Sequence, residues 1–307
     1  MKKIVVTCKT NPDIDRFACA FAYKEFLNKI GQTAEFFIFG EVHDEVKYLL
    51  KRFNISWADK AAESFDGTAE IILVDCSDSR GLDESINPAN VVEVIDHRRV
   101  NDVRLFPNAK IEIELVGAAA TLIAEKFIER QVDISREVAA LLYGAIISNT
   151  LNFKAKVTTA RDRAAAQWLK EKGNAPDDLA YEMFLAKSDL QGDKLKERIN
   201  SDFAWFDFNG KKIGIAQIEM IGAKDLVTQR QGEILAELAK LKNQLNLDYV
   251  FLSIIELEEG FNLFLTDNEP TQKILRDILN IEFQDNQAIM PCLIMRKEIV
   301  PFLKDYF

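Results

Sequence analysis

The chain has 307 residues, with 49 acidic against 39 basic side chains and a formal net charge of −10. This excess of acid argues against broad nucleic-acid binding, which depends on a basic surface that releases counterions from phosphates. The sequence contains no apolar run of the roughly 20 residues needed to cross a membrane, and no secretory signal, so we expect a cytoplasmic protein without membrane attachment.

The N-terminal segment predicts a buried strand followed directly by a helix. Residues 3–7 are short, apolar and β-branched, and a helical apolar stripe begins at Arg16 and stops at Gly31. Asp13 and Asp15 therefore lie at the start of the helix. They could cap the helix, because Asp is a favoured N-cap residue, or they could bind a divalent metal ion.

Two later strands also end in acidic residues. The run EIILVD ends in Asp75, and VVEVIDH ends in Asp96 and His97. The carboxyl ends of parallel strands share one edge of a sheet, where open α/β folds bind ligands. Because carboxylates and an imidazole together suit transition metals better than magnesium, these residues predict a metal site at that edge.

The order of elements predicts an α/β N-terminal domain with a mostly parallel sheet flanked by helices. Further strands are expected at residues 34–39, 70–74, 91–95 and 111–115, and helices at residues 121–130, 136–148 and 160–172. A polar segment that begins at Lys187 is interpreted as a linker. We therefore place the first domain at residues 1–187 and the second at residues 194–307.

The second domain is expected to be a smaller α+β domain with a mixed sheet. Asn209 and Gly210 separate two apolar runs, which predicts a two-residue hairpin turn. A second hairpin is expected around Gly260. Between the hairpins, a long helix presents one apolar face that contains Ile234, Leu238, Leu241 and Leu245.

Several motifs occur in an order that resembles the DHH phosphoesterase superfamily. They are NPDID, the acid at Asp75, the pair Asp96 and His97, GAAAT and GAIISNTL. Within the superfamily, the chain is most similar to the family II, manganese-dependent inorganic pyrophosphatases, and the similarity covers nearly its whole length. The second half resembles the DHH-associated domain that closes over the substrate in pyrophosphatases and exopolyphosphatases.

The resemblance implies roles for individual residues. Asp15, Asp75 and His97 would bind one metal ion, with Asn149 in the position of a family aspartate. Asp13 and Asp75 would serve a second ion. The catalytic residues would be Asp15, Asp75, His97 and Arg98, and the substrate-binding residues would be Lys9, Arg98, Arg296 and Lys297.

The departures from the family pattern reduce the expected metal content. Lys9 stands where the family has a histidine of the second ion, and Arg98 replaces the second histidine of the DHH motif. An ammonium group cannot coordinate a cation, but beside Asp13 it could replace one electrostatically. We therefore expect one ion rather than two, with manganese first and cobalt or magnesium as alternatives. A decayed site, in which Lys9 merely neutralises surplus carboxylates, is the other interpretation.

The function implied by the resemblance is metal-dependent hydrolysis of a phosphoanhydride or another small phosphorylated compound, with weak activity or altered specificity. One alternative is a non-catalytic protein that binds phosphate ligands. A second alternative is an exopolyphosphatase or an oligonucleotide phosphodiesterase. The expected partners are a small phosphorylated substrate or phosphate, and a second copy of the chain bound through the N-terminal domain.

Overall fold

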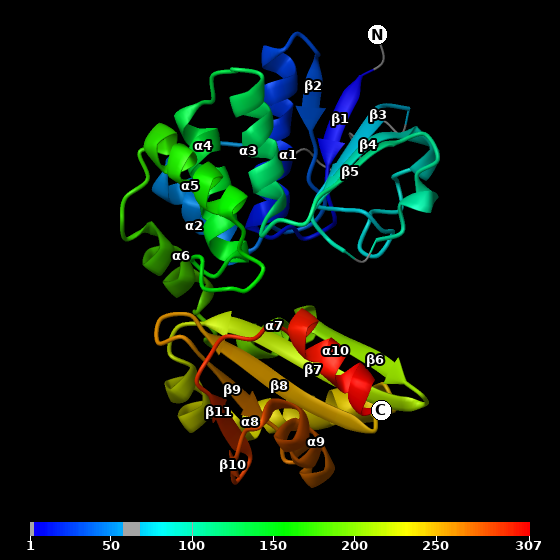
Figure 1. The fold of residues 1–307 in the computed structure, drawn as a ribbon, viewed down its shortest axis with the longest axis vertical. Helices are drawn as coiled ribbons and strands as arrows, with labels where there is room; N and C mark the ends of the chain where they lie inside the picture. Colours follow the sequence, from blue (N-terminus) through cyan, green and yellow to red (C-terminus); the bar gives the residue numbers. More distant parts are fainter. Residues whose placement is uncertain (1–2, 58–67, 100) are drawn as a thin grey trace. The chain divides into compact units, whose positions relative to one another are not determined.

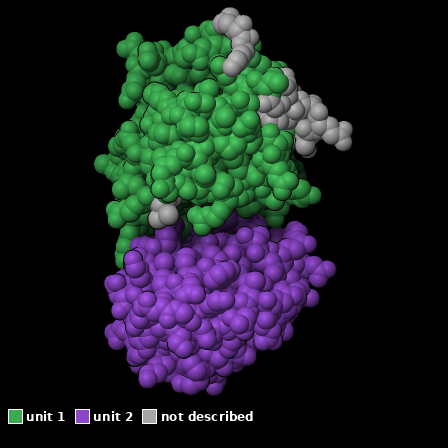
Figure 2. All heavy atoms as spheres, turned by 90° about the vertical axis from the view of Figure 1, so that its right-hand side faces the viewer, with its two compact units in different colours: residues 1–183 green, residues 184–307 purple. Residues whose placement is uncertain are grey.

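The computed structural model describes residues 3–57, 68–99 and 101–307. The chain divides into two compact units, Met1–Met183 and Phe184–Phe307 (Figure 2). The division lies within helix α6 (Leu179–Lys187), a few residues before the polar segment that the sequence suggested as a linker.

The first unit is built on a five-stranded, fully parallel sheet with the strand order β2-β1-β3-β4-β5 (Figure 1). The strands are β1 (Ile4–Thr7), β2 (Ala34–Phe36), β3 (Glu70–Val74), β4 (Val91–Asp96) and β5 (Lys110–Ile113). The chain moves from β1 outward to β2, and then to β3 on the opposite side of β1. The carboxyl ends of β1 and β3 therefore flank the point where the strand order reverses, which is where open α/β sheets bind ligands.

Helices gather on one side of this sheet (Figure 1). They are α1 (Ile14–Lys29), α3 (Ala119–Glu129), α4 (Arg136–Asn149) and α5 (Ala160–Gly173), and α2 (Asp44–Arg52) packs against α1 and α4. Ile71 and Leu73 of β3 pack against Ile86 and Phe106, which come from connecting segments that include two short 3-10 turns, Pro88–Asn90 and Val103–Leu105. The expected mostly parallel α/β architecture is confirmed.

Two predicted strands are shorter or shifted in the structure. The run expected at residues 34–39 leaves the sheet after Phe36, although Phe37 and Phe39 remain buried in the core. Phe37 still donates its N–H to the carbonyl oxygen of Val6 at 2.9 Å, so only the residues beyond Phe37 are apolar because of burial rather than strand pairing. The strand expected at residues 111–115 is β5 (Lys110–Ile113), and Leu115 beyond it is exposed.

The second unit contains a six-stranded mixed sheet with the order β10-β11-β9-β8-β7-β6, in which only β7 and β8 pair in parallel. Its strands are β6 (Phe203–Phe208), β7 (Lys211–Met220), β8 (Tyr249–Glu256), β9 (Phe261–Leu265), β10 (Phe283–Gln284) and β11 (Gln287–Met290). Its helices are α7 (Lys194–Ser201), α8 (Ala223–Gln244), α9 (Glu269–Leu279) and α10 (Arg296–Tyr306).

The hairpin signals of the second unit are confirmed. Phe208 pairs with Lys211, so Asn209 and Gly210 form a two-residue turn, and both have the positive φ that this turn requires, at 53° and 83°. In the parts of the chain that the structure describes, no helix combines the length and the apolar character needed to cross a membrane.

Candidate metal centre

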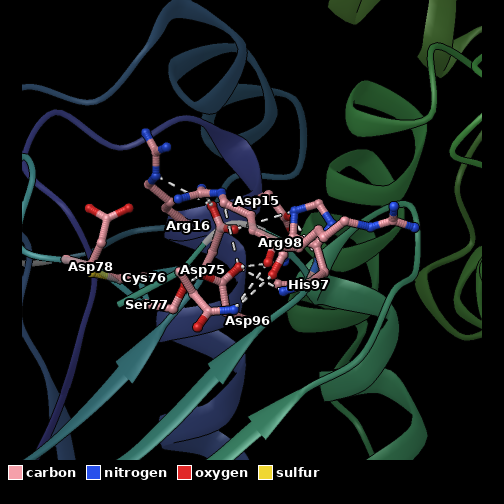
Figure 3. A network of polar contacts seen from close by, with 12 residues as sticks. Asp15, Arg16, Asp75, Cys76, Ser77, Asp78, Asp96, His97 and Arg98 are labelled. Carbon is pink, nitrogen blue, oxygen red and sulfur yellow. Dashed lines mark hydrogen bonds and ion pairs between the residues drawn. The ribbon is translucent and has the colours of Figure 1, made fainter. Parts of the chain in front are cut away.

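Three predicted ligands lie together at the carboxyl edge of the parallel sheet. Asp15 lies in the first turn of α1, Asp75 follows β3, and His97 follows β4. One oxygen or nitrogen atom from each residue lies within 4.8 Å of the other two, and Figure 3 shows the side chains converging beyond the strand tips. Within the described residues, this is the single group of three or more His, Cys, Asp or Glu side chains with such spacing.

Asp15 is fully buried and held by backbone amides. Its Oδ2 accepts the N–H of Ala119 at 2.9 Å, and its Oδ1 accepts the N–H of Ala120 at 2.9 Å. Both amides belong to the N-terminus of α3, which favours a negative charge. Burial and the neighbouring charge of Asp75 nevertheless raise the pKa of Asp15 to about 7. The carboxylate is therefore fixed in place and carries a proton at mildly acidic pH.

Asp75 adopts a left-handed backbone conformation, with φ of 47°, which is uncommon for a residue other than glycine and is often found at functional sites. Its Oδ2 accepts a hydrogen bond from Nη2 of Arg98 at 2.8 Å, and Nε of Arg16 lies 3.3 Å from the same oxygen. Burial works to raise the pKa of Asp75, but Arg98, His97 and Arg16 lower it below its ordinary value. Asp75 therefore stays ionised.

The ring of His97 is oriented by the backbone. Its Nδ1 donates to the carbonyl oxygen of Val116 at 2.9 Å, so Nε2 points toward Oδ1 of Asp75, at 3.4 Å, and Oδ2 of Asp15, at 3.8 Å. This arrangement leaves Nε2 as the nitrogen that can bind a metal. Although burial opposes it, the contact with Asp75 at 3.4 Å and the negative charges of Asp75 and Asp15 raise the pKa of His97 to about 9.

The chemistry of the three groups fits one divalent cation. Two carboxylates and an imidazole are ligands that manganese, iron, cobalt and zinc accept. Oδ1 of Asp75 is buried and has no hydrogen-bond partner, although it faces the other two ligands. Because buried polar atoms are usually paired, an acceptor without a hydrogen bond at this point fits a bound cation.

Asp13 is paired with Arg16. Its Oδ1 caps α1 by accepting the N–H of Arg16 at 3.0 Å, and its Oδ2 lies 3.4 Å from Nη1 of the same residue. Lys9, which we expected beside Asp13, instead forms a 2.7 Å ion pair with Asp78. The positive charge at Asp13 thus comes from Arg16. Sequence reasoning missed Arg16, and the available signal was a basic residue directly after the NPDID motif.

Asn149, at the end of α4, contacts the site through its amide nitrogen. Its Nδ2 donates to Oδ2 of Asp15 at 2.6 Å. In this orientation Asn149 positions Asp15. The side-chain oxygen of Asn149 would have to turn toward a metal ion to bind it.

The carboxylate of Asp96 is used for hydrogen bonds within its own turn. It accepts hydrogen bonds from Ser77 and from the backbone N–H groups of His97 and Arg98. It fixes the turn that carries His97.

The two predicted substrate-binding residues of the second unit begin α10. Arg296 donates from Nη1 to the carbonyl oxygen of Asp202 at 2.6 Å and from Nη2 to its carboxylate at 2.5 Å. Its backbone N–H also donates to Gln217 at 2.7 Å. Lys297 follows in the first turn of the helix. The guanidinium of Arg296 is therefore committed to contacts within its own unit.

Comparisons with known proteins agree with this architecture. Residues 3–146 match the model of the DHH family N-terminal domain, and residues 181–306 match the DHHA2 domain. The chain is 32% identical to the manganese-dependent inorganic pyrophosphatase of Bacillus subtilis, with 99% of both chains covered. It is 30% identical to that of Methanothrix thermoacetophila, covering 99% of this chain and 98% of the relative. A Methanococcus jannaschii protein assigned to the family II inorganic pyrophosphatases has a similar structure, with a TM-score of 0.77, 26% identity and 98% of both chains covered.

Proposed function

Because this chain belongs to the DHH family of manganese-dependent inorganic pyrophosphatases, we propose that it hydrolyses pyrophosphate or a related small phosphoanhydride with one divalent cation. The ligands of the cation would be Asp15, Asp75 and His97. Manganese is the expected cation, because the related pyrophosphatases of Bacillus subtilis and Methanothrix thermoacetophila are described as manganese-dependent.

The observation that carries this proposal is the unpaired Oδ1 of Asp75. This acceptor is buried, and it faces Nε2 of His97 and the carboxylate of Asp15. A cation would satisfy all three groups at once and would relieve the repulsion between the two carboxylates. The hydrogen bond from His97 to Val116 supports the same conclusion, because metal-binding histidines usually donate their other nitrogen in this way.

Different residues of the site would have different roles in the reaction. A divalent cation held by Asp15, Asp75 and His97 would lower the pKa of a bound water and polarise a phosphoryl oxygen. Asp15 and His97 are held rigidly by the backbone of residues 116–120, so the site needs little reorganisation when the substrate binds. Arg98 is 28% exposed in its side chain and carries a positive charge beside Asp75, which suits it to bind phosphoryl oxygens.

A second candidate function is binding of a phosphate ligand without turnover. The specific observation in its favour is the pair of guanidinium groups on Oδ2 of Asp75, from Arg98 at 2.8 Å and Arg16 at 3.3 Å. These charges occupy one side of the carboxylate and restrict it to a single metal-binding oxygen. A site with reduced metal capacity would stabilise the transition state of hydrolysis less well.

Release of inorganic phosphate from pyrophosphate tests the proposal. We expect release that depends on added manganese and falls about 100-fold or more in His97→Ala and Asp75→Asn, because each variant loses a metal ligand. The matched control is His43→Ala, since His43 precedes α2 and its side chain makes no capping hydrogen bond. Absence of release with manganese, cobalt and magnesium would reject the hydrolase. Retained pyrophosphate binding in that case would support the second candidate.

A further inference from the structure

Two arginines of the site contact the carboxylates of Asp13 and Asp75. Arg16 lies between Asp13, at 3.4 Å, and Asp75, at 3.3 Å, and Arg98 lies 2.8 Å from Asp75. A guanidinium group keeps its charge at any physiological pH and has no lone pair for coordination. It therefore neutralises a carboxylate permanently and excludes a metal ion from the oxygen that it contacts.

Arg16 is also under-used as a hydrogen-bond donor. Its side chain approaches Asp13 and Asp75 only at ion-pair distances, and its Nε is buried without a hydrogen-bond partner. Within residues 3–57, 68–99 and 101–307, the buried side-chain nitrogen and oxygen atoms that lack such a partner are this Nε and Oδ1 of Asp75. Both lie in one site. Oδ1 of Asp75 is an acceptor that suits a cation, whereas Nε of Arg16 faces Oδ2 of Asp75 at 3.3 Å, so a ligand would have to meet the exposed part of the Arg16 side chain.

Both arginines can be reached from solvent. The side chains of Arg16 and Arg98 are 21% and 28% exposed, and Arg98 uses only Nη2 for hydrogen bonds among the described residues. Two of the other basic residues that we expected to bind phosphate are engaged elsewhere, Lys9 with Asp78 and Arg296 with Asp202. Arg16 and Arg98 supply positive charge beside the three predicted ligands.

We propose that Arg16 and Arg98 take the place of a second metal ion and form a subsite for one phosphoryl group of the ligand. The inference deepens the proposed function, but anion binding by the arginines does not itself require the first cation. The two guanidinium charges offset two of the three charges on Asp13, Asp15 and Asp75.

The test uses methylenediphosphonate, a pyrophosphate analogue that cannot be hydrolysed, in isothermal titration calorimetry with a chelator present. We expect the metal-free protein to bind it. Arg16→Gln and Arg98→Gln should each weaken binding about tenfold or more, since each removes charge-assisted hydrogen bonds. Arg104→Gln is the matched control, because Arg104 belongs to the same unit and its side chain is 90% exposed, and it should bind like the unmodified chain.

Arg16→Lys is a second variant in which a folding defect is less expected, because lysine keeps the positive charge. Lysine lacks the planar guanidinium group that contacts both Asp13 and Asp75. Thermal unfolding of each variant shows whether it folds. A folded Arg16→Lys that binds the analogue about tenfold less tightly supports the subsite. No binding without metal, or equal affinity in Arg16→Lys, Arg98→Gln and the unmodified chain, overturns it. Manganese-dependent phosphate release is measured separately, so loss of that activity with retained analogue binding rejects only the hydrolase.

Discussion

Nδ1 of His97 donates a hydrogen bond to the carbonyl oxygen of Val116 at 2.9 Å. Val116 begins the segment whose later amides, from Ala119 and Ala120, hold the carboxylate of Asp15. A single backbone segment, residues 116–120, thus orients two of the three predicted ligands. The geometry of the metal site depends on how firmly this segment is held.

The segment is anchored by the buried carboxylate of Asp162. Its oxygens accept the N–H of Gly117 at 2.9 and 3.0 Å and the hydroxyl of Thr121 at 2.6 Å. A Cβ on Gly117 would lie 2.6 Å from Cγ2 of Thr150 and 2.9 Å from Oδ2 of Asp162, so only glycine permits this close approach. Asp162 therefore positions the segment that orients two of the predicted ligands, Asp15 and His97.

We predict that Asp162→Ala destabilises the protein by about 3 kcal/mol or more, because several buried donors lose their acceptor at once. Manganese affinity should fall about 10- to 100-fold in the fraction that remains folded. Urea unfolding and manganese titration measure the two effects. Asp177→Ala is the control, because the carboxylate of Asp177 is 96% exposed and pairs with Lys170, and it should change neither quantity appreciably. Unchanged manganese affinity in folded Asp162→Ala would refute the positioning role.

Manganese affinity should increase with pH. The pKa values of Asp15, about 7, and His97, about 9, both lie above their ordinary values, so the metal-free site holds protons that a cation must displace. Affinity should rise as the pH passes through 7 toward 9 and then level off. Calorimetry in buffers of different ionisation enthalpy would detect the released protons. Affinity that does not change over this range would contradict the assigned ligands.

The metal-free protein should show the opposite trend in stability. A group whose pKa is higher in the folded state than in the unfolded state binds protons more strongly when folded, so its contribution is lost as the pH rises. For His97 this contribution is present below the ordinary histidine value and disappears as the pH passes 9. Asp15 loses its contribution at lower pH, between its ordinary value of 3.8 and about 7. With a chelator present, the unfolding midpoint of the unmodified chain should therefore fall more steeply toward pH 9 than that of His97→Gln. Parallel curves would contradict this prediction.

Restoring the family ligands at Lys9 and Asn149 should not be sufficient for two ions. Asn149→Asp adds a ligand to the first site, and Lys9→His adds one at the second. Asp13, however, stays paired with Arg16. We predict that the double variant Lys9→His with Asn149→Asp binds one manganese ion more tightly, and that adding Arg16→Ala allows a second. Electron paramagnetic resonance of free manganese gives the stoichiometry. Two ions in the double variant would show that Arg16 does not block the second position.

The sequence predicts the scaffold of the site better than its ion pairs. The periodic patterns of strand β3, helix α4 and the hairpin turn at Asn209 and Gly210 depend on local physics, so their positions agree with the structure within one residue. The pairing of Lys9 with Asp78 spans 69 residues and follows from the fold. Sequence spacing carries no information about such a contact.

The role of Arg16 was missed for a related reason. The first turn of a helix accepts many kinds of side chain. The apolar pattern of α1 therefore does not indicate that the side chain of Arg16 lies between Asp13 and Asp75. The charge of Arg296 was assigned to a ligand, whereas the structure places it against Asp202. Which carboxylate a long basic side chain pairs with depends on the tertiary structure.

We expect one divalent cation, held by Asp15, Asp75 and His97, to support phosphoanhydride hydrolysis at this site. The decisive measurement is phosphate release from pyrophosphate as a function of the number of manganese ions bound per chain. Release should rise in proportion to bound manganese and should saturate at one ion per chain. No release at full occupancy, or release that begins only after a second ion binds, would contradict it.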